Sequence, residues 1–437
     1  MASPRRIALS FLYASLFAPA ALAYKPLSDN FLRQIPAASD AELDPTSGDL
    51  LAPFLQPRTP GSAGHADVQD HLVQWFASNL PDWKVEWQNS TVYKNTPGSS
   101  LNGGKLAAHN RSNLIFRREP PWTRPGQANL LTLAAHYAMP ATAPAGAVGA
   151  TDAAVSCALL LHTARSLDRY AAQMYREMQE LGEGGTVPMD MGLQVVFIDG
   201  GGGLEDQTSS NNSVNSVNSV NSVNNSSGTA AESLAAAWER ATNPALAASL
   251  YGYPNRLNQV SLLLLVDLLG AAAPRVPSRY QTTHWAYKAM ALVESRLREL
   301  KLMDTVLATA SAAFLPDAAT EPVHQLGMAA SGWPTDNDDH VPFMRRGVNV
   351  LPVVPDARPA LAGTAQDDGS NVDRKTVRDW SRVLVGFALE WLDMMEVEPP
   401  AAPAVPAAPV TTPAAPARLR QGLKRGLKRG PSLEAGR

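Results

Sequence analysis

The chain has 437 residues and a formal net charge of -3, a weakly acidic balance that excludes the basic surface of a nucleic-acid-binding protein. Its single cysteine excludes an intrachain disulfide framework and a zinc site built from several thiolates. The fold must therefore be stabilised by an apolar core, and the length fits one large α/β domain of roughly 300 to 370 residues.

Residues 1–23 have the pattern of a secretory signal peptide. Arg5 and Arg6 precede a short apolar run that ends in Ala21-Leu22-Ala23, the small-residue pattern of a cleavage site. No later run is long and apolar enough to cross a bilayer. We therefore expect a mature monomer without a membrane span, secreted or held in the secretory-pathway lumen.

N-glycosylation sequons fit the same compartment. Those at Asn211, Asn224 and Asn225 lie in Asn/Ser-rich sequence, where such triplets arise by chance. Asn89-Ser-Thr and Asn110-Arg-Ser lie in ordinary sequence and carry more weight. We therefore expect a glycoprotein.

Apolar spacing predicts the helices and strands of the rest of the chain. Helical spacing indicates helices over 41–55, 65–80, 153–167, 232–240, 282–302 and 372–395. Alternating or continuous apolar residues indicate strands over 83–92, 113–116, 129–135, 193–198, 259–266 and 348–354. This alternation predicts a single globular α/β domain, 24–397, with a mostly parallel central sheet and helices on both faces.

Two polar or biased segments are predicted to be disordered. An insertion over about 207–228 repeats Ser-Val-Asn in tandem, and 398–437 is rich in Pro and Ala before it becomes basic. Such sequences bury too little apolar surface to order themselves.

The strand 193–198 ends at Asp199 and is followed by four glycines, Gly200 to Gly203. Ligands of an open α/β sheet bind beyond the carboxyl ends of its strands. A phosphate cradle would need a helix directly after the glycines, whereas in this chain the insertion follows. A nucleotide site is therefore not expected.

Polar residues also follow other predicted strands. His136 ends one strand, Asp267 follows another, and Asp152 comes after Gly-Ala-Thr at the start of a helix. Imidazole and carboxylate groups can bind a metal, so these three residues are candidate ligands if they converge above the sheet. Asp152 alternatively caps the helix or belongs to a turn.

The densest polar cluster precedes the strand 348–354 and consists of Asp336, Asp338, Asp339 and His340. These groups either bind metal or cap and hydrogen-bond the turn. Because adjacent residues point in different directions, at most one or two can share a site, so we favour a supporting role.

The order of these motifs resembles the secreted glutaminyl-peptide cyclotransferases (glutaminyl cyclases), which share the fold of the zinc aminopeptidases. The resemblance spans about 27–396 and rests on PRTPGSAG at 57–64, AHY at 135–137, GATDAAVSCALLL at 149–161, VFIDG at 196–200, LLVDLLGA at 264–271 and DDHVPFMRRGVNVL at 338–351. It implies a zinc cofactor held by Asp, Glu and His. It also implies cyclisation of an N-terminal glutamine of peptides or proteins, with release of ammonia and a second Glu moving the proton.

At the level of single residues, some functional positions of the family are matched in this chain and others are not. Asp152 stands at the zinc-binding Asp and Asp267 at a supporting Asp, whereas Asp339 and His340 stand at a pair that braces the site. By the same resemblance, glycines and an alanine replace the other functional residues. They are Gly201 at the acid/base Glu, Gly202 at the zinc-binding Glu, Ala362 at the pocket Trp and Gly363 at the zinc-binding His.

A catalytic zinc needs about three protein ligands. Of the implied set only Asp152 remains, with Glu205, Asp206 and His136 as possible substitutes. We therefore predict a glutaminyl-cyclase-like protein with a degraded, weak or inactive site.

Two alternatives stay open. One is a non-catalytic scaffold that binds peptides or proteins, and the other is an aminopeptidase-like zinc hydrolase with a metal site rearranged around His136, Asp152 and Asp267. A gene-model error over 201–227 is a further interpretation, but it does not account for Ala362 and Gly363.

Overall fold

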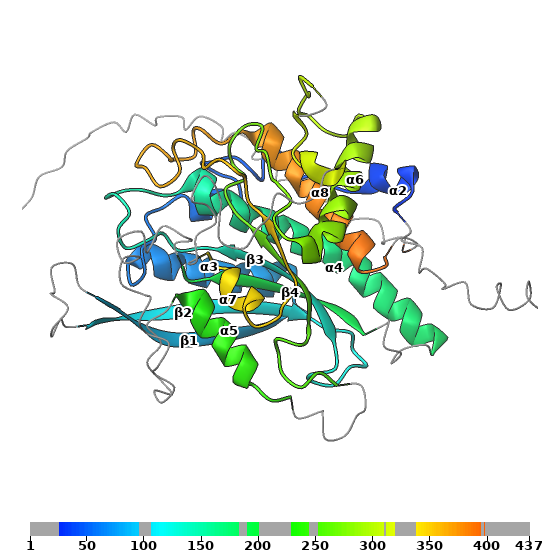
Figure 1. Ribbon diagram of the computed structural model, residues 1–437, viewed down its shortest axis with the longest axis horizontal. Helices are drawn as coiled ribbons and strands as arrows, with labels where there is room; N and C mark the ends of the chain where they lie inside the picture. The colour runs from blue at the N-terminus through cyan, green and yellow to red at the C-terminus, as the bar shows by residue number, and fades with distance from the viewer. Residues whose placement is uncertain are drawn as a thin grey trace, which may run out of the picture. The chain divides into compact units, whose positions relative to one another are not determined.

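The protein is organised around a six-stranded sheet with the order β1-β2-β4-β3-β5-β6. Figure 1 shows β1 and β2 side by side. The computed structural model describes residues 26–95, 106–182, 190–200, 229–243, 252–309, 312–319, 338–394 and 397. All of them belong to one compact unit, Met1–Pro399. The expected signal peptide, the insertion over 207–228 and the tail over 398–437 lie outside the described residues.

The four strands β3 (Asn129–His136), β4 (Met191–Ile198), β5 (Val260–Val266) and β6 (Val350–Val353) run parallel to one another. β1 (Lys84–Asn95) and β2 (Leu106–Arg118) form an antiparallel pair that joins β4. The predicted α/β class with a mostly parallel sheet is confirmed, with an antiparallel pair at one edge.

Helices cover both faces of the sheet because its central strands are apolar on both sides. Leu133 and Ala135 of β3 belong to one buried cluster, and Ala134 between them belongs to another. The first cluster contains residues of α2 (Asp29–Gln34), α3 (Ala63–Asn79), α4 (Val155–Leu181), α6 (His284–Glu299) and α8 (Arg374–Trp391). The second contains residues of α5 (Ala230–Arg240) and α7 (Val341–Met344). Among the described residues, no helix has the length and apolar character needed to span a membrane.

The predicted helix over 41–55 is wrong. The segment forms turns and a short 3-10 helix, Ala52–Phe54. The carboxylate of Asp44 accepts hydrogen bonds from the backbone N–H groups of Thr46 and Ser47, each at 3.0 Å. This local bonding competes with helical bonding, because short polar side chains offer the backbone an alternative partner.

A buried carboxyl on α8 holds the start of the described chain. The backbone N–H of Leu27 donates a 2.8 Å hydrogen bond to Glu390 Oε1. Burial raises the pKa of Glu390 from 4.5 to about 7. The folded protein therefore binds a proton at Glu390 more readily than the unfolded chain does.

We expect this carboxyl to make stability pH-dependent. Its contribution is fully present below pH 4.5 and is lost as the pH rises towards 7, because ionisation must then occur in a buried place. Glu390→Gln should flatten the fall in the free energy of unfolding across this window, measured by urea denaturation. Glu299→Gln on an exposed position of α6 is the control, and an unchanged slope in Glu390→Gln would contradict the assignment.

Candidate functional site

The candidate site lies at the carboxyl ends of the parallel strands. His136 is the last residue of β3, and Asp267 directly follows β5. Because β3 and β5 are parallel neighbours, the two side chains leave the same end of the sheet. Asp152 lies in a single π-helical turn, Ala150–Ala154, in front of α4.

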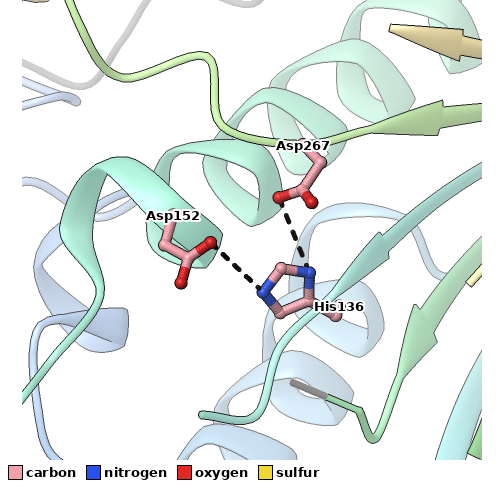
Figure 2. Close-up of side chains that lie close together, drawn as sticks. All are labelled: His136, Asp152 and Asp267. Atoms are coloured by element: carbon pink, nitrogen blue, oxygen red, sulfur yellow. Dashed lines mark ion pairs between the residues drawn. The ribbon is translucent and has the colours of Figure 1, made fainter. Parts of the chain in front are cut away.

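The three side chains converge (Figure 2). His136 Nε2 lies 3.9 Å from Asp152 Oδ1, and His136 Nδ1 lies 3.6 Å from Asp267 Oδ1. All three residues are buried, and one potential ligand atom from each lies within 4.8 Å of the others. The arrangement therefore gathers one imidazole and two carboxylates in a place shielded from water.

Burial governs the charge of this group. It raises the pKa of Asp267 well above the ordinary value, and the nearby negative charge of Asp152 raises it further. Burial also raises the pKa of Asp152, although the positive charges of Arg358 and Arg58 oppose this effect. Two carboxylates this close favour a cation between or beside them.

Arg358 supplies such a cation from the chain itself. Its Nη2 lies 3.3 Å from Asp152 Oδ2, the carboxylate oxygen other than the one that faces His136. Arg358 comes from the segment after β6, the same segment that carries Ala362 and Gly363. The guanidinium therefore places a positive charge beside the Asp152 carboxylate.

The turn that presents Asp152 is held by a second, fully buried arginine. Arg58 donates hydrogen bonds to the carbonyls of Phe54 and Tyr137, both at 2.6 Å, and to that of Gly149 at 3.3 Å. It also donates to the carbonyl of Val148. One guanidinium thus joins three separate loops at this edge of the sheet.

A carboxylate caps the same turn. Asp367 Oδ1 accepts a 2.8 Å hydrogen bond from the N–H of Thr151, and Oδ2 accepts one of 3.3 Å from the N–H of Asp152. The carbonyl of Asp367 accepts a further bond from the N–H of Ala150. The N–H groups that open the helix are thereby satisfied by the chain's own oxygens.

Asp339 and His340 lie near this group. His340 Nε2 is 2.6 Å from the hydroxyl of Tyr280, and burial lowers the pKa of His340 to about 3, so its ring is neutral at physiological pH. Asp339 Oδ1 would lie 3.3 Å from a Cβ built on Gly200, which places Asp339 beside the end of β4. The negative charge of Asp339 also raises the pKa of Asp267.

Ala362 and Gly363 lie in a turn that offers no ligand side chain. The N–H of Ala362 donates to the carbonyl of Pro359 at 3.0 Å, and the N–H of Thr364 donates to that of Leu361 at 2.9 Å. Ala362 packs against the second apolar cluster, and Gly363 has a φ of 79°. Gly201, Gly202, Glu205 and Asp206 lie outside the described residues.

Sequence reasoning missed a buried polar group beside the site. Asp199, directly after β4, accepts a 2.7 Å hydrogen bond from the N–H of Ser112. Its other oxygen lies 3.0 Å from His65 Nε2 and 3.5 Å from Arg111 Nη1. The position of Asp199 at a strand end was a signal, but its partners are 134 and 88 residues away along the chain.

The donor sets differ in how well they fit zinc. In the set implied by the resemblance, Gly363 offers no ligand side chain and Gly202 lies outside the described residues, so Asp152 is the one side-chain ligand that the described part of the chain provides to that set. The set of His136, Asp152 and Asp267 has the right donor chemistry, but Arg358 already contacts one of its carboxylates. Arg358 contacts Asp152 Oδ2, whereas His136 faces Asp152 Oδ1, so a divalent metal held by this second set would either share Asp152 with the guanidinium or displace it.

The fold places the chain in a class of α/β proteins, those that share the fold of the solved Macrostomum lignano glutaminyl cyclase. That structure is 22% identical, covers 85% of this chain and 95% of its own, and gives a TM-score of 0.58. No family model matches the chain.

Relatives at the sequence level carry the assignment further. The mouse glutaminyl-peptide cyclotransferase-like protein is 30% identical over 360 residues, 81% of this chain and 77% of the relative. The bovine glutaminyl-peptide cyclotransferase is 28% identical over 347 residues, 79% of this chain and 81% of the relative. The chain belongs to the glutaminyl-peptide cyclotransferase family.

We expect Gly149→Ala to destabilise the turn that presents Asp152. Gly149 has a φ of 57°, and an added Cβ would lie 2.2 Å from Met139 Sδ. The backbone conformation costs about 1–2 kcal/mol and overpacking about 1–3 kcal/mol in the free energy of unfolding.

Urea denaturation of a double-mutant cycle separates the two effects. In the background of Met139→Ala, the loss caused by Gly149→Ala should fall to the backbone contribution alone, about 1–2 kcal/mol. An equal loss in both backgrounds would show that Met139 is not the obstacle.

Proposed function

We propose that this chain is a family member that no longer cyclises N-terminal glutamine and acts as a scaffold that binds peptides or proteins. The observation that carries the proposal is the contact of Arg358 Nη2 with Asp152 Oδ2 at 3.3 Å. A guanidinium there provides the positive charge that the carboxylate would otherwise receive from a metal. Free peptide N-termini are the ligand class, by analogy with the activity for which the relatives are named.

The composition of the aligned positions supports the same proposal. By family resemblance, Gly202 and Gly363 replace two zinc ligands, and Gly201 replaces the residue that moves the proton. Glycine provides neither a ligand nor an acid/base group. Loss of the metal and of proton transfer together removes both parts of the chemistry.

The proposal also includes entry of the chain into the secretory pathway. We propose that residues 1–23 direct it into the secretory pathway and are removed, since they combine a basic start, an apolar run and a small-residue cleavage pattern. The folded domain then acts as a monomer outside the cell or in the pathway lumen.

One specific observation favours a second candidate, an aminopeptidase-like hydrolase with a rearranged metal site. His136, Asp152 and Asp267 are buried with potential ligand atoms within 4.8 Å. In this alternative they hold a divalent metal, and Arg358 moves aside from Asp152.

We expect the purified chain without residues 1–23 to bind substoichiometric zinc and to release no ammonia from a Gln-initiated peptide. Metal analysis and an ammonia assay measure the two quantities. About one zinc per chain with ammonia release would refute the scaffold proposal. About one zinc, lost in His136→Ala, with hydrolysis of an aminoacyl amide instead would establish the second candidate.

A matched variant tests the opposite change by introducing the residues that the family resemblance implies at the altered positions. A variant with Gly201→Glu, Gly202→Glu, Ala362→Trp and Gly363→His tests whether the fold still accepts the zinc site. Zinc binding gained in this variant would attribute the loss of metal to these four positions. The left-handed backbone at Gly363 disfavours a side chain, although His tolerates this region better than most residues.

Arg358→Ala should expose Asp152 to external cations. Without zinc, the variant should lose up to about 3 kcal/mol of stability, since one partner of a largely buried pair is removed. Added Zn²⁺ should raise the Tm of the variant more than that of the unaltered chain. Arg374→Ala removes a guanidinium from the exposed pair with Asp44 and is the control. An equal rise in Tm with Zn²⁺ in the unaltered chain and in both variants would show that Arg358 does not limit the access of Zn²⁺ to Asp152.

A further inference from the structure

Two sequons face each other across the β1–β2 pair. In the antiparallel register, Asn89 lies opposite Ser112 and Thr91 lies opposite Asn110. Each asparagine is therefore opposite the hydroxyl residue of the other triplet. The four side chains share one face of the two strands, because residues two apart point to the same side.

The two asparagines differ in what holds their side chains. Asn110 Oδ1 accepts a 3.1 Å hydrogen bond from the hydroxyl of Thr91. Asn89 is exposed, and within the described part of the chain no hydrogen bond engages its side chain. Asn89 therefore presents its amide to solvent, whereas Asn110 is tied to the neighbouring strand.

Apolar side chains lie on the same face of the same strand. β1 is first in the sheet order, so its outer edge has no partner strand among the described residues. Val85 and Trp87 are 47% and 41% exposed, and they precede Asn89 at intervals of two residues, so the three side chains lie on one face of β1. An exposed apolar edge strand promotes pairing with other chains unless something covers it.

We propose that Asn89 carries an N-linked glycan whose first sugar packs on the indole of Trp87 and covers the apolar part of β1. The amide nitrogen of Asn89 loses a proton and bonds to the anomeric carbon of the sugar. The lipid diphosphate of a lipid-linked oligosaccharide leaves with the electron pair. The apolar C–H face of the sugar then meets the aromatic face two residues away, on the same side of the strand.

The proposal rests on entry into the secretory pathway, so the test separates the two. Residues 1–23 are replaced by a leader of known cleavage, and the chain is expressed in a eukaryotic secretory host. Peptide mapping after enzymatic deglycosylation reports the occupancy of each asparagine. The parallel experiment with the native residues 1–23 tests the routing alone.

We expect Asn89 to be occupied in the leader-cleaved chain. Asn89→Gln should remove one glycan from the intact mass, while the matched variant Asn110→Gln should retain the glycan at Asn89. A leader-cleaved chain with an unmodified Asn89 overturns the proposal.

Thermal denaturation tests the contact between the first sugar and the indole of Trp87. Removal of the glycan should lower the Tm of the chain and increase its aggregation. In Trp87→Ala, where the aromatic face is absent, the same removal should change the Tm much less. An equal change in Tm with and without Trp87 overturns the packing of the sugar on the indole.

Discussion

The buried guanidinium of Arg58 is the interaction on which the edge of the sheet depends. It donates to carbonyls of the segment before α3, of the residue after β3, and of the loop before the π-helical turn. Removal of a buried arginine would leave several carbonyls without donors, and each buried unsatisfied group costs about 1–3 kcal/mol. This network ties the residue after His136 to the loop before Asp152, whereas the parallel strands β3 and β5 bring Asp267 beside them.

The strand ends could be predicted because they depend on local pattern. Continuous apolar runs marked β3, β4 and β5, and parallel neighbours bring their carboxyl ends to one edge. His136 and Asp267 were therefore expected close together. The helix expected over 41–55 failed because Asp44 bonds to its own turn, which apolar spacing does not reveal.

The contacts that decide the chemistry could not be predicted in this way. Arg358 and Asp152 are 206 residues apart, and their contact depends on how the segment after β6 folds back over the sheet. Asp367 and Arg58 act on backbone groups, so nothing in the residue pattern identifies their partners. Gly201 and Gly202 gave a clear signal in the sequence, but they lie outside the described residues.

Asp367 bonds to the backbone of the turn that carries Asp152, and these bonds do not involve the side chain that would bind a metal. The backbone N–H groups of the turn donate to the Asp367 carboxylate, so the chain itself supplies the acceptors that hold this backbone. A lineage with such a turn can lose metal-binding residues one at a time while the surrounding architecture stays intact. Substitution of a ligand residue is then expected to change metal binding while the fold stays stable, so a change in chemistry need not pass through an unfolded state.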